Sequence, residues 1–125
     1  MATKILFIED EFALQKTLGS FLSQEGYEVI SALDGEIGLR FAEKDKPDMI
    51  LLDLILPKMN GFEVLQKLKE NEETQKIPVL VLTNLEEMND INRAIELGAT
   101  TYLVKAQYSL DEVLEKIKSV LDSVR

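Results

Sequence analysis

The 125-residue sequence contains neither cysteine nor histidine, and each absence removes a class of function. Without cysteine, these residues can form neither a disulfide framework nor a thiolate zinc site. Without histidine, they cannot supply a Ser-His-Asp triad or a histidine-ligated metal site. No apolar run approaches membrane-spanning length, and the first predicted strand begins at Ile5, which leaves no room for a signal peptide. We therefore expect a cytoplasmic protein that does not bind membranes.

Basic residues are scarce, since 14 Lys and Arg stand against 23 Asp and Glu and give a net charge of −9. Direct nucleic-acid binding needs clustered positive charge, so this balance argues against it. Neither G-x-G-x-x-G nor G-x-x-x-x-G-K-[ST] occurs, which argues against Rossmann dehydrogenases and P-loop nucleotide enzymes. The length and a hydrophobic content of 46% are those of one globular domain with a proper core, and we expect residues 1–125 to form it.

Short apolar runs alternate with helical patterns along the chain. The runs are short and rich in β-branched residues, which is typical of strands buried on both faces of a parallel sheet. Helix ends are marked by Gly26 and Gly98, and Ser109 with Glu112 forms a capping box before the last helix. Five βα units with right-handed crossovers predict one doubly wound α/β domain with helices on both faces. The expected strands are Ile5–Ile8, Tyr27–Ala32, Met49–Leu52, Val79–Leu82 and Thr101–Val104.

Polar residues follow these apolar runs at the points where four strands end. They are Glu9 with Asp10, then Asp53, Thr83 and Lys105. In doubly wound sheets, ligands bind beyond the carboxyl ends of the strands, so these side chains should converge on one crevice. Each placement alone has an ordinary explanation, such as an acid or a capping hydroxyl at a helix start. Their coincidence in consecutive βα units favours a functional site.

The chemistry of such a site follows from charge. Close carboxylates from Glu9, Asp10 and Asp53 cannot all stay ionised without a counter-charge. Mg²⁺ suits them, because it takes one or two carboxylates, keeps several waters and is completed by phosphate oxygens. Beside such a cation Asp53 can attack phosphorus and form an aspartyl phosphate, while Lys105 and Thr83 hold the phosphoryl oxygens. The sequence thus predicts Mg²⁺-dependent phosphoryl transfer to Asp53.

Four segments together resemble the receiver domain of two-component response regulators, and the resemblance covers the whole chain. It implies a flavodoxin-like fold with a five-stranded parallel sheet in the order 2-1-3-4-5. It also implies a signalling switch that accepts a phosphoryl group from a sensor histidine kinase or phosphotransfer protein. The segments are ILFIEDE (5–11), MILLDLILPKMNG (49–61), VLVLT (79–83) and GATTYLVK (98–105).

The same resemblance implies a role for each matching acid. Asp53 matches the phosphoacceptor and Asp10 the direct metal ligand. Glu9 matches the acid that usually acts through metal-bound water, and the backbone carbonyl of Ile55 matches a further ligand. The implied cofactor is Mg²⁺, and the chain would be no enzyme beyond promoting its own phosphorylation and dephosphorylation.

The resemblance also implies how the signal leaves the site. Thr83 matches the hydroxyl that contacts the phosphoryl group, Lys105 the lysine beside it, and Tyr102 the switch aromatic. The surface of the fourth helix, fifth strand and fifth helix would bind a downstream protein. Regulators that dimerise through this surface usually carry acids where Thr100 and Thr101 stand here, so we expect a monomer.

Two further features bear on how the expected site would work. Ala106 follows Lys105 where the family usually has proline, which leaves the geometry of that peptide open. Ile55 and Leu85 match the positions that flank the approach of water to the phosphoryl group. Both are apolar and bulky, so neither can orient a water molecule. We expect slow hydrolysis of the phosphorylated state.

The main alternative is an Mg²⁺-dependent phosphatase with an aspartyl nucleophile. Such an enzyme needs a second acid beside the nucleophile as general acid, and usually a cap over the site. Residue 55, two positions after Asp53, is isoleucine, and no insertion is long enough to form a cap. Steady turnover of phosphate esters, against a burst of one phosphoryl group per chain, distinguishes the two functions.

Overall fold

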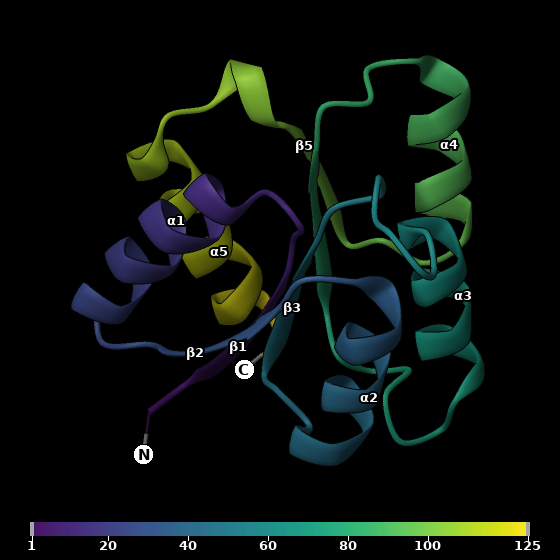
Figure 1. Cartoon of the computed structure of the whole chain (residues 1–125), viewed down its shortest axis with the longest axis horizontal. Coiled ribbons are helices and arrows are strands. Elements are labelled where there is room, and N and C mark those ends of the chain that lie inside the picture. The colour runs from purple at the N-terminus through teal and green to yellow at the C-terminus, as the bar shows by residue number, and fades with distance from the viewer. Residues whose placement is uncertain (1, 125) are drawn as a thin grey trace.

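The computed structural model describes residues 2–124, in which strands and helices alternate as the sequence predicts. The second strand begins at Glu28, one residue later than expected, and a short 3-10 helix follows the last strand (Figure 1). The elements are β1 (Lys4–Ile8), α1 (Phe12–Gln24), β2 (Glu28–Ala32), α2 (Gly35–Asp45), β3 (Met49–Leu52), α3 (Gly61–Glu70), β4 (Val79–Thr83), α4 (Met88–Glu96), β5 (Thr101–Val104), η1 (Lys105–Gln107) and α5 (Leu110–Ser123).

The strands form one parallel sheet in the order β2-β1-β3-β4-β5, which confirms the expected flavodoxin-like topology. The chain goes from β1 outward to β2 and then returns past β1 to β3, so the strand order reverses between β1 and β3. Ile8 and Leu52, the last residues of these two strands, are neighbours in the register. The residues that follow them, Glu9 and Asp53, therefore begin side by side at the carboxyl edge of the sheet.

Helices cover both faces of the sheet, α1 and α5 on one face and α2, α3 and α4 on the other (Figure 1). Successive strand side chains point to opposite faces. Leu6 and Ile8 of β1 accordingly pack with residues of α2, α3 and α4, whereas Ile5 and Phe7 pack with α1 and α5. These strand residues are buried on both sides, as the continuous apolar runs predict.

Local side-chain contacts determine where three helices begin. Asp34 and Asn60 each accept a hydrogen bond from the backbone N–H three residues later, at 2.8 and 3.0 Å. Ser109 and Glu112 form the reciprocal capping box that the sequence predicts. Gly98, just after α4, has a φ of 109°, a left-handed conformation that glycine adopts without strain. Across residues 2–124, no helix combines the length and apolar character that crossing a membrane requires.

Candidate functional site

The structure places the predicted site residues at one edge of the sheet. Glu9 and Asp10 follow β1, Asp53 follows β3 directly, Thr83 is the last residue of β4, and Lys105 is the first residue after β5. Because all strands are parallel, their carboxyl ends meet at the same edge. The point where the strand order reverses, between β1 and β3, lies at the three acids.

The acids form a compact cluster. Each of Glu9, Asp10 and Asp53 offers a carboxylate oxygen, and these oxygens lie within 4.8 Å of one another. Glu9 is fully buried and Asp53 is 4% exposed, whereas Asp10 faces solvent. The backbone N–H of Glu11 donates to Glu9 Oε2 at 3.0 Å, and that of Ile55 donates to Asp53 Oδ1 at 3.2 Å. The backbone around the cluster thus orients two of the three carboxylates.

Lys105 brings a positive charge between the two buried acids. Its Nζ donates a hydrogen bond to Asp53 Oδ2 at 3.0 Å and lies 2.7 Å from Glu9 Oε1. The second contact is an ion pair without hydrogen-bond geometry, so Glu9 Oε1 has no hydrogen-bond donor among the described residues. Glu11 Oε1 lies further away, at 3.7 Å. The Lys105–Ala106 peptide is trans, like every peptide bond of the described chain, so Lys105 reaches the acids without a cis bond.

The proton affinities reflect this crowding. Burial raises the pKa of Glu9 from 4.5 to about 7, and the negative charge of Asp53 adds to the effect, while Lys105 and the Glu11 N–H oppose it. Burial alone would lower the pKa of Lys105, but Glu9 and Asp53 together raise it above its usual value. Lys105 therefore stays protonated at neutral pH, and one ammonium is shared by two buried carboxylates.

A hard divalent cation fits this donor set. Three carboxylates lie within reach of one ion, and burial disfavours the charged form of Glu9. An added cation relieves the repulsion between like charges and favours ionised oxygen ligands. Asp10, the exposed member, faces the solvent from which a cation would arrive. The Ile55 carbonyl lies in the loop that carries Asp53, and its role as a ligand stays a prediction.

Thr83 ends β4 and Tyr102 lies in β5, the two strands beyond β3 in the sheet. Thr83 is fully buried, and its Oγ1 has no hydrogen-bond partner in the described part of the chain. A buried hydroxyl without a partner is costly, so this one is available to a ligand that reaches it, and its role toward a phosphoryl group stays a prediction. Tyr102, half-buried on β5, donates its hydroxyl to the Leu85 carbonyl at 2.9 Å. Burial, aided by the charges of Asp90 and Asp53, raises the pKa of Tyr102 to about 12 and keeps it a donor.

Two residues shape the site although neither is predicted from the sequence to have a role there. A Cβ added to Gly61 would lie 2.3 Å from the carbonyl oxygen of Asp53, so α3 can begin this close to the site only with glycine there. Gln15 is buried in α1 and donates to the Glu9 carbonyl at 3.1 Å. Its sequence signal is its spacing, since it precedes the core residues Leu18 and Leu22 by three and seven positions. Gly61 is the last residue of the segment MILLDLILPKMNG, but that segment does not show why glycine is required there.

The chain matches a family model described as the response regulator receiver domain over residues 5–118. It is 40% identical over 121 residues to the alkaline phosphatase synthesis transcriptional regulatory protein PhoP of Bacillus subtilis (strain 168). That match covers 97% of this chain and 49% of PhoP. The chain thus spans about half the length of the transcriptional regulators that it matches.

Solved structures agree with this match. The receiver domain protein of Methanospirillum hungatei JF-1 has a TM-score of 0.92 and 28% identity, with 98% of this chain and 96% of that chain covered. The receiver domain of the sensor histidine kinase PA1611 from Pseudomonas aeruginosa PAO1 has a TM-score of 0.88 and 25% identity, with coverages of 98% and 99%. The PA1611 structure has a magnesium ion coordinated in its active-site cleft. Both similarities extend over nearly the whole chain.

The crowding of acids leads to a prediction about stability. Asp10→Asn should raise the melting temperature of the metal-free protein, because it removes one of three neighbouring negative charges. It should also reduce the rise in melting temperature that magnesium causes, because it replaces a charged carboxylate ligand with a neutral amide oxygen. Thermal unfolding with a chelator and with excess magnesium measures both effects. Glu115→Gln, at an exposed acid of α5, is the control and should change neither. An undiminished magnesium effect in Asp10→Asn would contradict a cation site at this residue.

Proposed function

The chain belongs to the response regulator receiver domain family, and we propose that Asp53 is the residue on which it accepts a phosphoryl group. Membership makes the chain a receiver of phosphorylation-dependent two-component signalling. The carboxylate of Asp53 is buried, contacts the Lys105 ammonium at 3.0 Å, and lies in the cluster with Glu9 and Asp10. Glu9 shares this burial and the contact with Lys105, but burial raises its pKa to about 7 and disfavours the ionised form that an attack on phosphorus requires.

The proposed reaction is an in-line displacement at phosphorus. A carboxylate oxygen of Asp53 attacks the phosphorus of a phosphohistidine, the P–N bond breaks, and the departing imidazole keeps the electron pair. Lys105 neutralises charge on one phosphoryl oxygen, and the Thr83 hydroxyl donates to another. Positioning and charge neutralisation are most of what such a transfer requires. The donor would be a sensor histidine kinase or a phosphotransfer protein.

Mg²⁺ is the proposed cofactor. Asp10, Asp53, Glu9 through a bound water, and the Ile55 carbonyl would hold it, and when bound it supplies positive charge for the phosphoryl oxygens. The cluster of three carboxylates supports this assignment, as does the magnesium ion in the PA1611 receiver domain. The buried Glu9 gains most from a cation, because its charged form is otherwise disfavoured.

We infer that the signal leaves through Thr83, Tyr102 and the surface of α4, β5 and α5. Thr83 and Leu85 lie two residues apart, and the Tyr102 hydroxyl is bound to the Leu85 carbonyl. A movement of Thr83 toward a phosphoryl group therefore pulls on the segment that holds Tyr102. A partner responds only if it binds the two states with different affinity. Charged side chains on or next to α4 and α5 are Glu86, Glu87, Asp90 and Lys116, and a fifth, Arg93 of α4, contacts α3.

The surface also has apolar groups that a partner can bury. Met88 and Ile95 of α4 are 65% and 48% exposed. Arg93 is held in place, with its guanidinium 4.2 Å above the centre of the Phe62 ring of α3. Apolar centres with a charged rim are typical of protein interfaces. We propose a downstream protein as the target of a monomeric receiver domain formed by residues 1–125, with no nucleic acid bound by this chain itself.

A labelling experiment tests the acceptor. With acetyl phosphate and magnesium, the protein should take up at most one phosphoryl group per chain, and Asp53→Asn should take up none. Asp111→Asn, which changes an exposed acid at the start of α5, should label normally. Persistent labelling of Asp53→Asn would place the acceptor elsewhere. Steady release of phosphate from many esters, in place of a single burst, would favour the phosphatase alternative.

The lifetime of the phosphorylated state is a separate prediction. Ile55 is 55% exposed beside Asp53, and Leu85 packs against the core. Because both side chains are apolar, neither offers a hydrogen bond to an attacking water. The double variant Ile55→Asn with Leu85→Glu should hydrolyse about tenfold faster, the gain that roughly 1.4 kcal/mol of transition-state stabilisation provides. Decay of the labelled protein after donor removal, in excess magnesium, measures this. Ile55→Val with Leu85→Met keeps both positions apolar and should decay as slowly as the unaltered protein. Loss of label from the unaltered protein within seconds would show the prediction wrong.

A further inference from the structure

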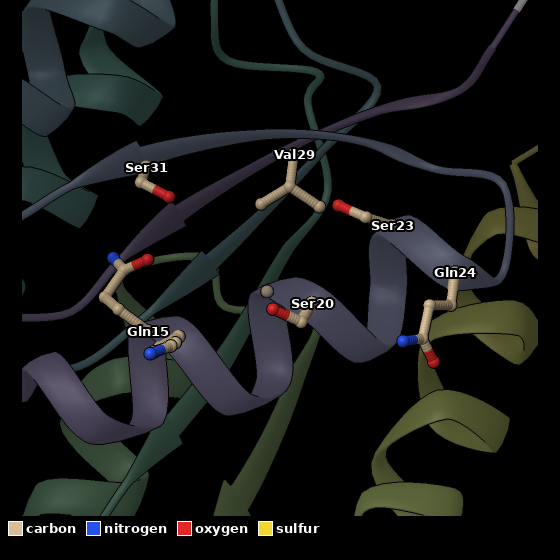
Figure 2. Close-up of a pocket in the computed structure, with 8 residues that line it drawn as sticks. Gln15, Ser20, Ser23, Gln24, Val29 and Ser31 are labelled. Carbon is tan, nitrogen blue, oxygen red and sulfur yellow. The ribbon is translucent and has the colours of Figure 1, made fainter.

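Gln15 is a polar side chain at a position where helical spacing predicts a core residue. It lies on the face of α1 that also carries Leu18 and Leu22, and only 6% of it is exposed. Its side chain extends from α1 toward the ends of β1 and β2 (Figure 2). A buried amide must find hydrogen-bond partners or destabilise the fold, so its contacts show what this position requires.

The amide nitrogen of Gln15 lies at a point where three backbone carbonyls converge. Nε2 donates to Phe7 O at 2.8 Å, to Glu9 O at 3.1 Å and to Ala32 O at 3.1 Å. An amide nitrogen has two hydrogens, so the three acceptors share them. The Glu9 N–H also donates to Ala32 O at 3.0 Å. The backbone of Glu9 is therefore held on both sides, at its N–H by Ala32 and at its C=O by Gln15.

The orientation of the amide is determined by these contacts. A rotation of the amide by 180° would place Oε1 against three carbonyl oxygens, and all four atoms are hydrogen-bond acceptors. The hydrogen-bond network therefore shows which end of the amide is nitrogen and which is oxygen. Oε1 has no hydrogen-bond partner within the described residues. This oxygen is buried, although Gln15 as a residue lines a groove of about 410 Å³ between α1 and β2, together with Ser20, Ser23 and Ser31 (Figure 2). Only a hydrogen-bond donor on the strand side satisfies the three carbonyls.

We propose that Gln15 is a positioning residue for the acid cluster, which acts through the backbone of Glu9. Glu9 and the adjacent Asp10 project from a loop that Gln15 ties to the ends of β1 and β2. This inference rests on the proposed function, because the loop matters only if the two acids hold a cation. Mg²⁺ demands nearly ideal octahedral geometry, so small displacements of its ligands cost affinity. Residues that orient metal ligands typically contribute about 10–100-fold to metal affinity.

Two substitutions of Gln15 distinguish an effect of positioning on magnesium affinity from an effect of charge. Gln15→Met keeps an unbranched side chain of similar length and removes both donor hydrogens. Gln15→Glu keeps the shape and places acceptor oxygens against the three carbonyls. Through space, its added negative charge would tighten the binding of a cation, whereas the loss of positioning weakens it. The two explanations thus predict opposite signs in Gln15→Glu.

The control is a buried polar residue remote from the site. Thr74 is fully buried, and its hydroxyl donates to the Leu68 carbonyl at 2.7 Å. Thr74→Val removes this buried side-chain donor near the amino end of β4, the opposite end of the strands from the acids. It should lower stability, as the Gln15 variants do, without moving Glu9 or Asp10.

The experiment measures magnesium affinity by calorimetry, stability by urea unfolding, and amide hydrogen exchange of the metal-free protein. Both Gln15 variants should bind magnesium about tenfold or more weakly. Exchange of the Glu9 amide should accelerate in them beyond the change in global stability. Thr74→Val should keep the magnesium affinity and the relative protection of Glu9. Three results would overturn the inference. A folded Gln15 variant could keep both its magnesium affinity and its Glu9 protection, or Gln15→Glu could bind magnesium more tightly. The third is a loss of magnesium affinity in Thr74→Val as large as in the Gln15 variants.

The proposed function and the inference fail in different ways. An unaltered protein that binds no magnesium would contradict the proposed cofactor. In that case the exchange of the Glu9 amide in metal-free Gln15→Met still reports whether Gln15 holds the loop. If Gln15→Glu does not fold, Gln15→Met decides the outcome by the same two measurements.

Discussion

The contact of one ammonium with two buried carboxylates is the interaction on which the rest of the site depends. Lys105 Nζ lies 2.7 Å from Glu9 and 3.0 Å from Asp53, and both acids are nearly inaccessible to solvent. An unpaired buried charge costs several kcal/mol, and even a paired one repays its desolvation only with good geometry. A single lysine cannot fully balance three acids. This deficit of positive charge makes the site suited to a cation and then to a phosphoryl group.

The parallel sheet is what makes this arrangement possible. β1 and β3 are central strands with residues buried on both faces, so the backbone to which Glu9 and Asp53 are attached is rigid. β5 delivers Lys105 from the far edge of the sheet, and the trans peptide after it shows that proline is not needed for this reach. Gln15 connects α1 to the acid loop through a hydrogen bond to the Glu9 carbonyl. Gly61 lets α3 begin close to Asp53, because it has no Cβ.

Much of this could be predicted from the sequence, because the signals are local. Apolar runs that end in polar residues predict both the sheet and the edge at which Asp53 and Lys105 meet. The resemblance to receiver domains adds the strand order, which the structure confirms. What sequence could not predict depends on tertiary placement. Adjacent acids differ completely in exposure, since Glu9 is buried and Asp10 is not, and the partner of the Gln15 amide is set by where β1 and β2 end.

The central claim is that Asp53 accepts a phosphoryl group, with Lys105 and a divalent cation neutralising the charge of the phosphoryl oxygens. Binding of beryllium fluoride, which mimics an aspartyl phosphate, tests it most directly, and fluorine NMR observes the bound form. The account predicts bound fluorine signals only when magnesium is present, and none in Asp53→Asn. Bound signals without magnesium, or signals that persist in Asp53→Asn, would contradict it.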